Sequence, residues 1–237
     1  MWSGPRNLST AMMRAFENRA DCTVSDEPFY AAYLAETGLD HPMREEVLAS
    51  QPTDWRVVAA ELTGSAPGNA PLWYQKHMTH HMLPAFGRDW IDQCRNAFLI
   101  RDPARALASY AAKREDVTLA DIGVVQQSEL FDRVADRLGQ APPVIDAADV
   151  LADPARTLGA LCAALGVAFD PAMLSWPAGR RDSDGVWAPA WYASVEASIG
   201  FAAPGGEVGE VPELPPHLAA IASQAQGHYR RLAAYRL

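Results

Sequence analysis

Short apolar segments alternate along this chain with longer segments of helical periodicity, and this alternation limits the fold more than any other feature. The apolar segments are residues 22–25, 72–75, 97–100 and 144–145. Strands joined through helices pair in parallel, because each crossover returns the chain to the same edge of the sheet. We therefore predict a three-layer α/β fold, in which a mostly parallel central sheet lies between helices.

Two of the predicted helices begin with an acidic residue followed by proline. Asp102 precedes the helix 104–114, and Asp153 precedes the helix 155–165. An aspartate accepts hydrogen bonds from the N–H groups of the first turn, and proline suits the first helical position. These pairs predict where both helices begin.

The length of 237 residues suits one domain. Residues 39–69 mix glycine, proline and charge around one amphipathic run at 55–62, and we expect them to form a lid. Residues 202–216 are rich in glycine and proline and predict a linker before a final helix at 217–236. An apolar face on that helix would support a homodimer.

The net charge of −9 gives the chain no positive field that would attract nucleic acid or an anionic membrane. Its three cysteines are distant from one another and show no metal-ligand spacing, which is typical of a reducing compartment. The chain shows no secretion signal and no apolar run of about 18 residues. We expect a soluble, cytoplasmic protein whose anionic ligands are held by a local cationic site.

The most informative motif is a polar loop that runs directly into the predicted helix 11–19. Such a loop presents unpaired backbone N–H groups and the positive end of the helix dipole, which together favour a phosphate or sulfate. An arginine and two hydroxyl groups would add donors. The alternative is a capped helix after a turn. The motif consists of Ser3, Gly4, Pro5, Arg6, Asn7, Leu8, Ser9 and Thr10.

The loop differs from the nucleotide-hydrolase loop G-x-x-x-x-G-K-[ST] in one chemical respect. If Gly4 aligns with the first glycine, Ser9 and Thr10 occupy the positions of the second glycine and the lysine. The lysine that contacts the β- and γ-phosphates is missing, so the loop is poorly equipped for phosphoryl transfer. It could still hold a 5′-phosphate.

A second motif follows the apolar segment 97–100, where Arg101 emerges at the predicted carboxyl edge of the sheet. Ligands of open α/β sheets bind at this edge. Ser109 lies in the second turn of the next helix. The alternative is that Arg101 pairs with Asp102 or with a surface carboxylate.

These motifs, in this order and spacing, resemble those of bacterial sulfotransferases that use 3′-phosphoadenosine 5′-phosphosulfate (PAPS). The resemblance rests on W-S-G-P-R-N-x-S-T, D-E-P-[FL]-Y, K-H-M-x-H-H and F-L-I-R-D-P-[AR]-x-x-L-A-S-Y, together with residues 170–192. It implies a P-loop-like α/β fold. It also implies transfer of a sulfuryl group from PAPS, without a metal, to a hydroxyl or amine of a small molecule, which leaves the product PAP.

The resemblance assigns the donor site to the first two motifs. Arg6 stands where the family usually has lysine, and Ser9 and Thr10 stand at its two hydroxyl positions. Arg101 and Ser109 match the pair that holds the 3′-phosphate. One position departs from the pattern, because Leu8 stands where glycine is common and must avoid a positive φ or accept strain.

The segment after residues 72–75 carries the candidate acid–base chemistry. In the family a lysine and a base histidine lie close together here; Lys76 corresponds well, and His77 is our first choice for the base, within a few residues of register. His77 would take the acceptor proton, and Lys76 would neutralise the bridging oxygen of the departing PAP. Together with His80 and His81, His77 also has the spacing of a zinc site, but no carboxylate or cysteine cluster accompanies it.

Two further acidic or basic pairs lie near predicted strand or loop ends. Glu27 competes with His77 for the role of base, and the alternative is that Asp26 or Glu27 caps the helix after Pro28. The resemblance makes Arg180 or Arg181 a late contact of the 3′-phosphate. A solvated arginine pair is the alternative there.

Two other functions remain open for this chain. One is a kinase-like phosphotransferase, which the missing loop lysine disfavours, and the other is a nucleotide-binding protein that has lost catalysis. A phosphate loop normally follows a strand of about 5–6 residues, whereas only Met1 and Trp2 precede Ser3. We therefore expect the natural protein to begin several residues upstream.

Overall fold

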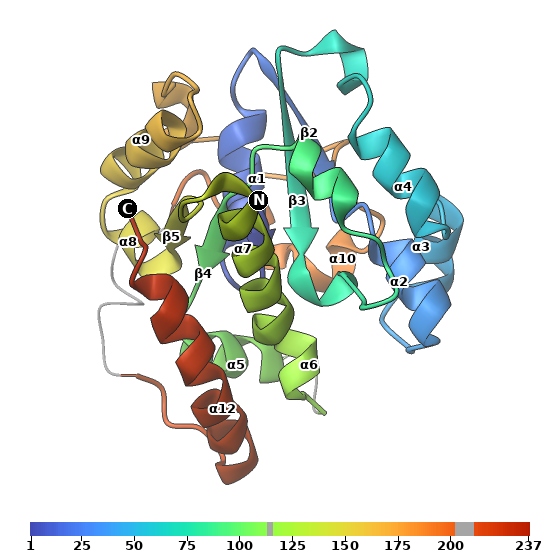
Figure 1. Ribbon diagram of the computed structural model, residues 1–237, viewed down its shortest axis with the longest axis vertical. Coiled ribbons are helices and arrows are strands. Elements are labelled where there is room, and N and C mark those ends of the chain that lie inside the picture. The colour runs from blue at the N-terminus through green and yellow to red at the C-terminus, as the bar shows by residue number, and fades with distance from the viewer. Residues whose placement is uncertain (113–115, 202–210) are drawn as a thin grey trace.

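The structure is a computed structural model that describes residues 1–112, 116–201 and 211–237. Five strands form one sheet in the order β2-β3-β1-β4-β5, and every neighbouring pair is parallel (Figure 1). The strands are β1 (Trp2–Ser3), β2 (Cys22–Asp26), β3 (Leu72–Met78), β4 (Phe98–Ile100) and β5 (Val144–Asp146). The predicted α/β fold is confirmed, and so are the four predicted strands, although β3 continues three residues beyond its predicted end.

Helices connect the strands and cover both faces of the sheet. In chain order they are α1 (Ser9–Glu17), α2 (Tyr30–Thr37), α3 (Arg44–Ser50), α4 (Trp55–Leu62), α5 (Pro103–Ala111), α6 (Leu119–Ile122), α7 (Val124–Leu138), α8 (Ala147–Ala152), α9 (Pro154–Ala164), α10 (Ala188–Trp191), α11 (Ala193–Glu196) and α12 (Pro216–Ala233). Short 3₁₀ turns complete the described part: η1 (Pro67–Asn69), η2 (Thr79–His81), η3 (Asp89–Gln93) and η4 (Pro171–Leu174).

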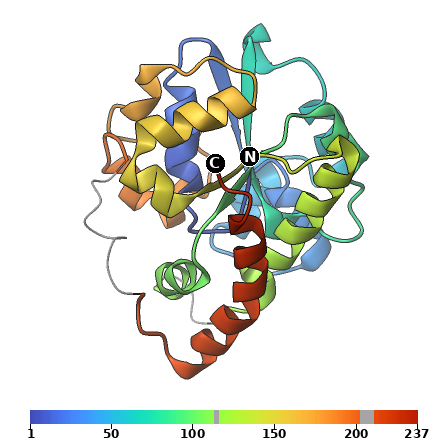
Figure 2. The same cartoon turned by 60° about the vertical axis from the view of Figure 1, so that its left-hand side comes forward.

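Successive side chains of each strand point alternately to the two faces of the sheet, and a separate apolar core lies on each face. Phe98 and Ile100 pack with α4, α7 and the end of α12, whereas Leu99 packs with α1, α8 and α9. Successive side chains of a strand point to opposite faces, so a strand buried on both sides is apolar throughout. Figure 2 shows the resulting layers, with α1, α8 and α9 on one side of the sheet and α7 on the other.

The predicted helix starts are confirmed by their caps. The Asp102 carboxylate accepts from the backbone N–H groups of Ala104 and Arg105, and Asp153 accepts from that of Arg156. The helices α5 and α9 therefore begin at the proline that follows each aspartate.

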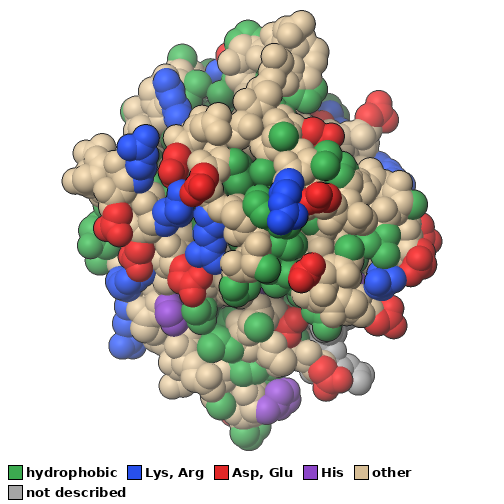
Figure 3. All heavy atoms as spheres, turned by 45° about the vertical axis from the view of Figure 1, so that its right-hand side comes forward, with side chains coloured by type: hydrophobic (Ala, Val, Ile, Leu, Met, Phe, Trp, Pro, Cys, Tyr) green, Lys and Arg blue, Asp and Glu red, His purple; other side chains and the backbone are tan. Residues whose placement is uncertain are grey.

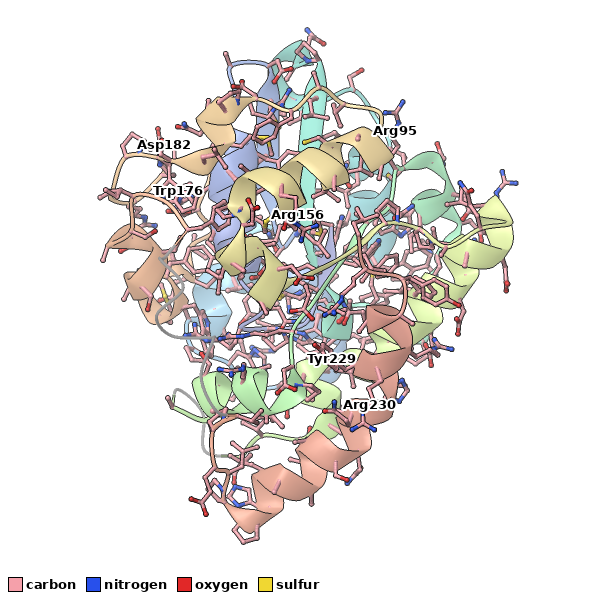
Figure 4. The ribbon with its side chains drawn as sticks, turned by 90° about the vertical axis from the view of Figure 1, so that its left-hand side faces the viewer. Arg95, Arg156, Trp176, Asp182, Tyr229 and Arg230 are labelled. Carbon is pink, nitrogen blue, oxygen red and sulfur yellow. The ribbon has the colours of Figure 1, made fainter. Side chains whose placement is uncertain are left out.

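The last helix crosses the sheet's β5 side and brings the final residues to that strand. Tyr229 of α12 lies beside this part of the sheet in Figure 4, and its hydroxyl donates to Asp146 at the end of β5. Beyond the helix, the backbone N–H of Leu237 donates to Val144. Most of the predicted linker, residues 202–210, lies outside the described residues. A homodimer through α12 stays a prediction.

The shortest strand, β1, occupies the centre of the sheet. Trp2 pairs with His77 on one side and with Phe98 on the other. The N-terminal ammonium of Met1 donates to the Gln75 carbonyl at 2.9 Å. This pairing places the loop after β1 between β3 and β4.

The segment 39–69 is mostly helical and is anchored in the core. Val58, Ala59 and Leu62 of α4 are buried in the apolar cluster that also contains Phe98 and Ile100. His41, before α3, reaches the cavity described below. A lid role for this segment stays a prediction.

The outer surface carries both signs of charge. Figure 3 shows acidic and basic side chains interspersed over one face, with no region of a single sign. No helix in the described part of the chain has the length and apolarity needed to cross a bilayer.

Candidate active site

A cavity of about 320 Å³ lies at the carboxyl edge of the sheet, where the loops after β1, β2, β3 and β4 meet. The segments after β1 and β4 contribute the predicted donor residues, and Glu27 after β2 and Lys76 within β3 are the predicted acid–base residues that line it. The C-terminal segment around α10 and α11 closes one side. The lining residues from the predicted sites are Pro5, Arg6, Leu8, Ser9, Thr10, Glu27, Lys76, Arg101 and Ser109.

The first loop keeps a strained backbone next to the cavity. Arg6 and Leu8 adopt left-handed conformations, with φ of 61° and 70°. For residues other than glycine this costs on the order of 1–3 kcal/mol each. Leu8 therefore accepts the strain that its position demands, and its side chain packs against the core under α1. Backbone strain held at a ligand site is typical of a preorganised loop.

The remaining residues of the first loop lie outside the cavity lining. Ser3, Gly4 and Asn7 do not line it; Ser3 and Asn7 are buried. A Cβ at Gly4 would lie 2.5 Å from the carbonyl oxygen of Ile122, so this position requires glycine. Helix α1 begins with Leu8 as N-cap and has no side-chain cap, which leaves the first-turn N–H groups to a ligand.

Two guanidinium groups meet beside this loop. Arg6 Nε donates to Ser109 Oγ at 3.0 Å, and Arg101 donates to the Arg6 backbone carbonyl. Burial lowers the pKa of Arg6, and burial together with Arg6 and Arg105 lowers the pKa of Arg101 to about 10. Both groups stay cationic at neutral pH. Two partly buried cations placed this close together form a site that favours a polyvalent anion.

On the other side of the cavity, Lys76 is buried in a network of ions. Its ammonium donates to Asp26 at 2.8 Å, to Glu27 at 2.7 Å and to the Tyr192 hydroxyl at 2.6 Å. Burial lowers the pKa of Lys76, but the two carboxylates more than offset this and raise it above its ordinary value. Lys76 therefore stays charged, and its three N–H donors are all occupied in this arrangement.

Glu27 is the carboxylate of this network that reaches the cavity. Its backbone is left-handed, with φ of 40°, and its backbone N–H donates to the Lys76 carbonyl. Burial raises the pKa of Glu27, Lys76 opposes the rise, and Asp26 adds to it. Two carboxylates share one ammonium here. The arrangement gives Glu27 the raised pKa that suits a general base.

The capping alternative for Asp26 and Glu27 is wrong. Helix α2 begins at Tyr30, its N-cap is Phe29, and no side chain caps it. Both carboxylates turn instead to Lys76, and Asp26 also accepts from Tyr192 at 2.7 Å. The two carboxylates pair with Lys76 and not with the helix end, because an unpaired buried ammonium would cost more free energy than an uncapped helix.

His77 does not line this cavity. Its ring stacks on Trp2 at 4.5 Å, lies near Trp90, and has Nε2 3.2 Å from Gln75 Oε1. It lines a second cavity of about 300 Å³ at the opposite, amino edge of the sheet. Neighbouring residues of a strand point to opposite faces, so a strand that aims Lys76 at the site turns His77 away. The geometry does not place His77 where an acceptor would meet Lys76 and Glu27.

Two later histidines reach the cavity in its place. His80 and His81 lie in η2, directly after β3, and His81 stacks on Tyr30 at 4.6 Å. The Tyr30 hydroxyl lies 2.9 Å from His41 Nδ1. Sequence reasoning left the histidine register open by a few residues but did not identify Tyr30 or His41. The usable signal was strand alternation, which favours histidines in the turn over the one beside Lys76.

Arg180 and Arg181 lie outside the cavity. Arg180 is exposed, and Asp182, two residues on, lies at the outer surface in Figure 4. The backbone N–H of Arg181 donates to Asp184, whose carboxylate also accepts from the buried Arg14 at 2.7 Å. This segment is thus held against α1 through Asp184. A phosphate contact for Arg180 or Arg181 stays a prediction that the geometry does not favour.

Zinc binding finds no support in the described part of the chain. No group of three or more histidine, cysteine or acidic side chains there could hold a metal ion. The three cysteines are free thiols.

Replacing Gly123 with alanine should destabilise the protein by roughly 1–3 kcal/mol more than the same change at Gly139. Both glycines have a positive φ, but a Cβ at Gly123 would lie 2.5 Å from Thr79 Oγ1 and 2.7 Å from the backbone nitrogen of His80. At Gly139 nothing lies within 4 Å. Urea unfolding of both variants measures the difference. Equal losses in the free energy of unfolding would show that the η2 turn can shift to accommodate the added Cβ at no cost.

Comparisons with known proteins bear on this site. A family model described as "Sulfotransferase domain" matches residues 1–223. Among curated proteins, the chain is 37% identical over 204 residues to branched-chain-amino-acid aminotransferase-like protein 1 of Arabidopsis thaliana, and 34% identical over 203 residues to protein 2 of that name. Each match covers 86% of this chain and 36% of the relative, so the chain spans about a third of the length of these relatives.

Solved structures share the fold. The sulfotransferase domain of an olefin synthase from Synechococcus PCC 7002 superposes with a TM-score of 0.55 at 18% identity, over 100% of this chain and 94% of that one. A sulfotransferase from Alicyclobacillus acidocaldarius gives a TM-score of 0.52 at 13% identity, over 100% and 96%. At these identities the likeness concerns the fold alone.

Proposed function

This chain belongs to the sulfotransferase-domain family, and from that premise we propose that it transfers a sulfuryl group from PAPS to a small molecule. The observation that carries the proposal is the cavity itself. It joins two arginine side chains, a strained loop at a helix N-terminus and a carboxylate of raised pKa. The chemistry is assigned to this domain only, and not to the longer curated relatives.

The donor fits the β1–β4 side of the cavity. The contacts of Arg6 within the described residues are to neutral atoms, Ser109 Oγ and the Trp191 carbonyl, so its charge is available to a ligand. We assign the 3′-phosphate of PAPS to Arg101 and Ser109. We assign the 5′-phosphosulfate of PAPS to Arg6, Ser9, Thr10 and the N–H groups of the first turn of α1.

The acid–base step fits the β2–β3 side. The acceptor oxygen bonds to sulfur while the bond from sulfur to the bridging oxygen breaks, and that oxygen keeps the electron pair on PAP. Glu27 takes the acceptor proton, because its carboxylate reaches the cavity and has a raised pKa. Lys76 keeps a positive charge beside the reaction without a free N–H, so it acts through its field and by orienting Glu27.

Selective stabilisation by PAP is the expected result of thermal unfolding with PAP, ATP or buffer. A ligand that binds only the folded state raises the apparent stability, by about 2.7 kcal/mol at a hundred times its dissociation constant. Stabilisation by ATP and not by PAP would favour the kinase-like alternative. No response to either would favour a protein that has lost its donor site.

Replacing Arg101 with alanine should weaken PAP binding by about 1.5–3 kcal/mol, because a charge-assisted contact to the 3′-phosphate is removed. Ser109→Ala should cost less. Calorimetric titration measures both. The matched control is Arg156→Ala, since Arg156 is exposed on α9, away from the cavity (Figure 4). Equal PAP affinity of folded Arg101→Ala and wild type would refute the assignment.

A further inference from the structure

We propose that Asp26 is a positioning residue that makes Glu27 a proton acceptor. It does so by giving the buried cluster around Lys76 one negative charge more than the lysine can neutralise. The inference rests on the proposed function, in which Glu27 is the base, and names the residue on which that base depends. Three observations support it: the charge of the cluster, the donors that hold Asp26, and the different exposure of the two carboxylates.

The cluster holds one cation between two carboxylates. Lys76 Nζ lies 2.8 Å from Asp26 Oδ1 and 2.7 Å from Glu27 Oε1. The side chains of Lys76 and Asp26 are 1% and 2% exposed, and that of Glu27 is 12% exposed. Water screens charges this deep only weakly, so one ammonium and two carboxylates leave an excess of one negative charge. A proton bound to either carboxylate would remove that excess.

Two titratable neighbours of the cluster are neutral. Burial, together with Asp26 and Glu27, holds the pKa of Tyr192 well above its ordinary value, and burial holds that of His81 well below its usual range. From the end of α3, the neutral amide of Gln51 donates to the backbone carbonyl of Glu27. The two arginines of the cavity lie on the donor side, after β1 and β4.

Two further histidines, His41 and His80, line the β2–β3 side of the cavity. Neither takes part in the ion pairs that join Lys76 to the two carboxylates. Lys76 and Asp26 are therefore the charged groups whose contacts decide whether Glu27 binds a proton.

Three donors from different segments hold Asp26 in its charged form. Oδ1 accepts from Lys76, and Oδ2 accepts from the Tyr192 hydroxyl at 2.7 Å and from the backbone N–H of Gly185 at 3.1 Å. Hydrogen bonds donated to a carboxylate stabilise its charged form. The two contacts at Oδ2 also tie residues 185–192, at the closed side of the cavity, to the end of β2. Asp26 itself does not line the cavity, so an acceptor cannot pass its proton to it directly.

Glu27 is the carboxylate that can take the proton. Its side chain lines the cavity, and its Oε1 accepts from Lys76. Burial raises the pKa of Glu27, Lys76 opposes the rise, and Asp26 adds to it. The proton moves from the acceptor to a Glu27 oxygen while the acceptor keeps the electron pair for its new bond to sulfur. The transfer leaves Lys76 paired with Asp26 and the cluster without net charge.

Carbon-13 NMR titration of the Glu27 carboxyl group tests the proposal on the full chain and needs no substrate. The protein is labelled at the side-chain carboxyl carbon of glutamate, and the Glu27 signal is the one that Glu27→Gln lacks. In the wild type this signal should titrate above the ordinary glutamate value of about 4.3. In Asp26→Asn its midpoint should fall by about one pH unit or more, because Glu27 no longer shares Lys76 with a second carboxylate.

Two other variants separate charge from structure. Asp26→Glu keeps the negative charge, so the Glu27 midpoint should stay within about 0.3 pH unit of the wild type. The matched control is Asp146→Asn, at the end of β5 on the opposite edge of the sheet from β2. Asp146 is likewise buried and accepts from a tyrosine hydroxyl, that of Tyr229, and from a backbone N–H. This control should leave the Glu27 midpoint unchanged even if stability falls.

Three results would overturn the inference. A purely structural role for Asp26 would lower the stability of Asp26→Asn without moving the Glu27 midpoint. An equal shift in Asp146→Asn would show that the effect is not specific to Asp26. A wild-type midpoint at or below the ordinary glutamate value would also contradict the inference, and this result needs no variant of Asp26.

Failure of the proposed function would look different. Stabilisation by PAP is measured separately on the wild type, and its absence would contradict the proposed function while the titration still reported on Asp26 and Glu27. Asp26→Asn should fold, because it removes the excess charge from the protein interior. If it does not, Asp26→Glu still decides, since a fall in the Glu27 midpoint with the charge retained would contradict the inference.

Discussion

Glu27→Gln lowers turnover by roughly 10²–10⁴-fold and leaves PAP affinity unchanged, if Glu27 is the general base. The amide keeps the size of the side chain and its contact with Lys76 but cannot accept a proton. The pH profile gives a second readout. Because burial raises the pKa of Glu27, the acidic limb of kcat/KM in the wild type should lie above the ordinary glutamate value, and the variant should lose that limb.

Two variants test whether the effect belongs to Glu27. Glu129→Gln removes a half-exposed carboxylate on α7 that pairs with Arg88, and turnover should stay at the wild-type level. His77→Ala should reduce stability through lost packing on Trp2 but should retain turnover per folded molecule. If activity is lost in His77→Ala and kept in Glu27→Gln, the base is the histidine.

Asp184→Ala should lower the free energy of unfolding by about 3–5 kcal/mol, the cost of leaving one member of a buried ion pair without its partner. Asp184 accepts from Arg14 at 2.7 Å, and both side chains are fully buried. Arg14 also contacts Glu17 at 3.3 Å, which compensates it only in part. Urea unfolding measures the loss.

A double variant shows whether the cost comes from the unpaired charge. Replacing Arg14 with methionine together with Asp184 with leucine removes both charges, and most of the lost stability should return. The single variant should also leave PAP affinity nearly unchanged, since neither residue lines the cavity. A loss below about 1 kcal/mol in Asp184→Ala would mean that the pair is solvated or unimportant for stability.

The fold, and the meeting of the loops after β1 and β4 at one cavity, could be predicted because both follow from local sequence signals. Apolar runs such as 98–100 are buried on both faces, and an aspartate before proline begins each of two helices. The arginine after such a run emerges at the carboxyl edge, where Arg101 contacts the backbone of Arg6, whose side chain in turn contacts Ser109. Periodicity and capping act over a few residues, so they can be read from one sequence.

The acceptor side could not be predicted to the same degree, because it depends on where one strand ends. With the third strand predicted to end at Gln75, Lys76 and His77 seemed to share a loop; in the structure β3 continues to Met78 and sends them to opposite faces. Tyr30 and His41 reach the cavity through tertiary packing of α2 and the segment after it. Nothing local marks such residues in the sequence.

The position of β1 also sets an order on folding. Met1 and Trp2 contact the middle of the sheet across long stretches of chain, 74 residues to Gln75 and 94 residues to Asn96. Contacts that close such long loops form late, because the entropy of closure must be offset by structure already present. The loop after β1 therefore takes its final position only after β3 and β4 have paired with β1. In a refolding experiment, the ability to bind PAP should appear after most of the helical signal has returned.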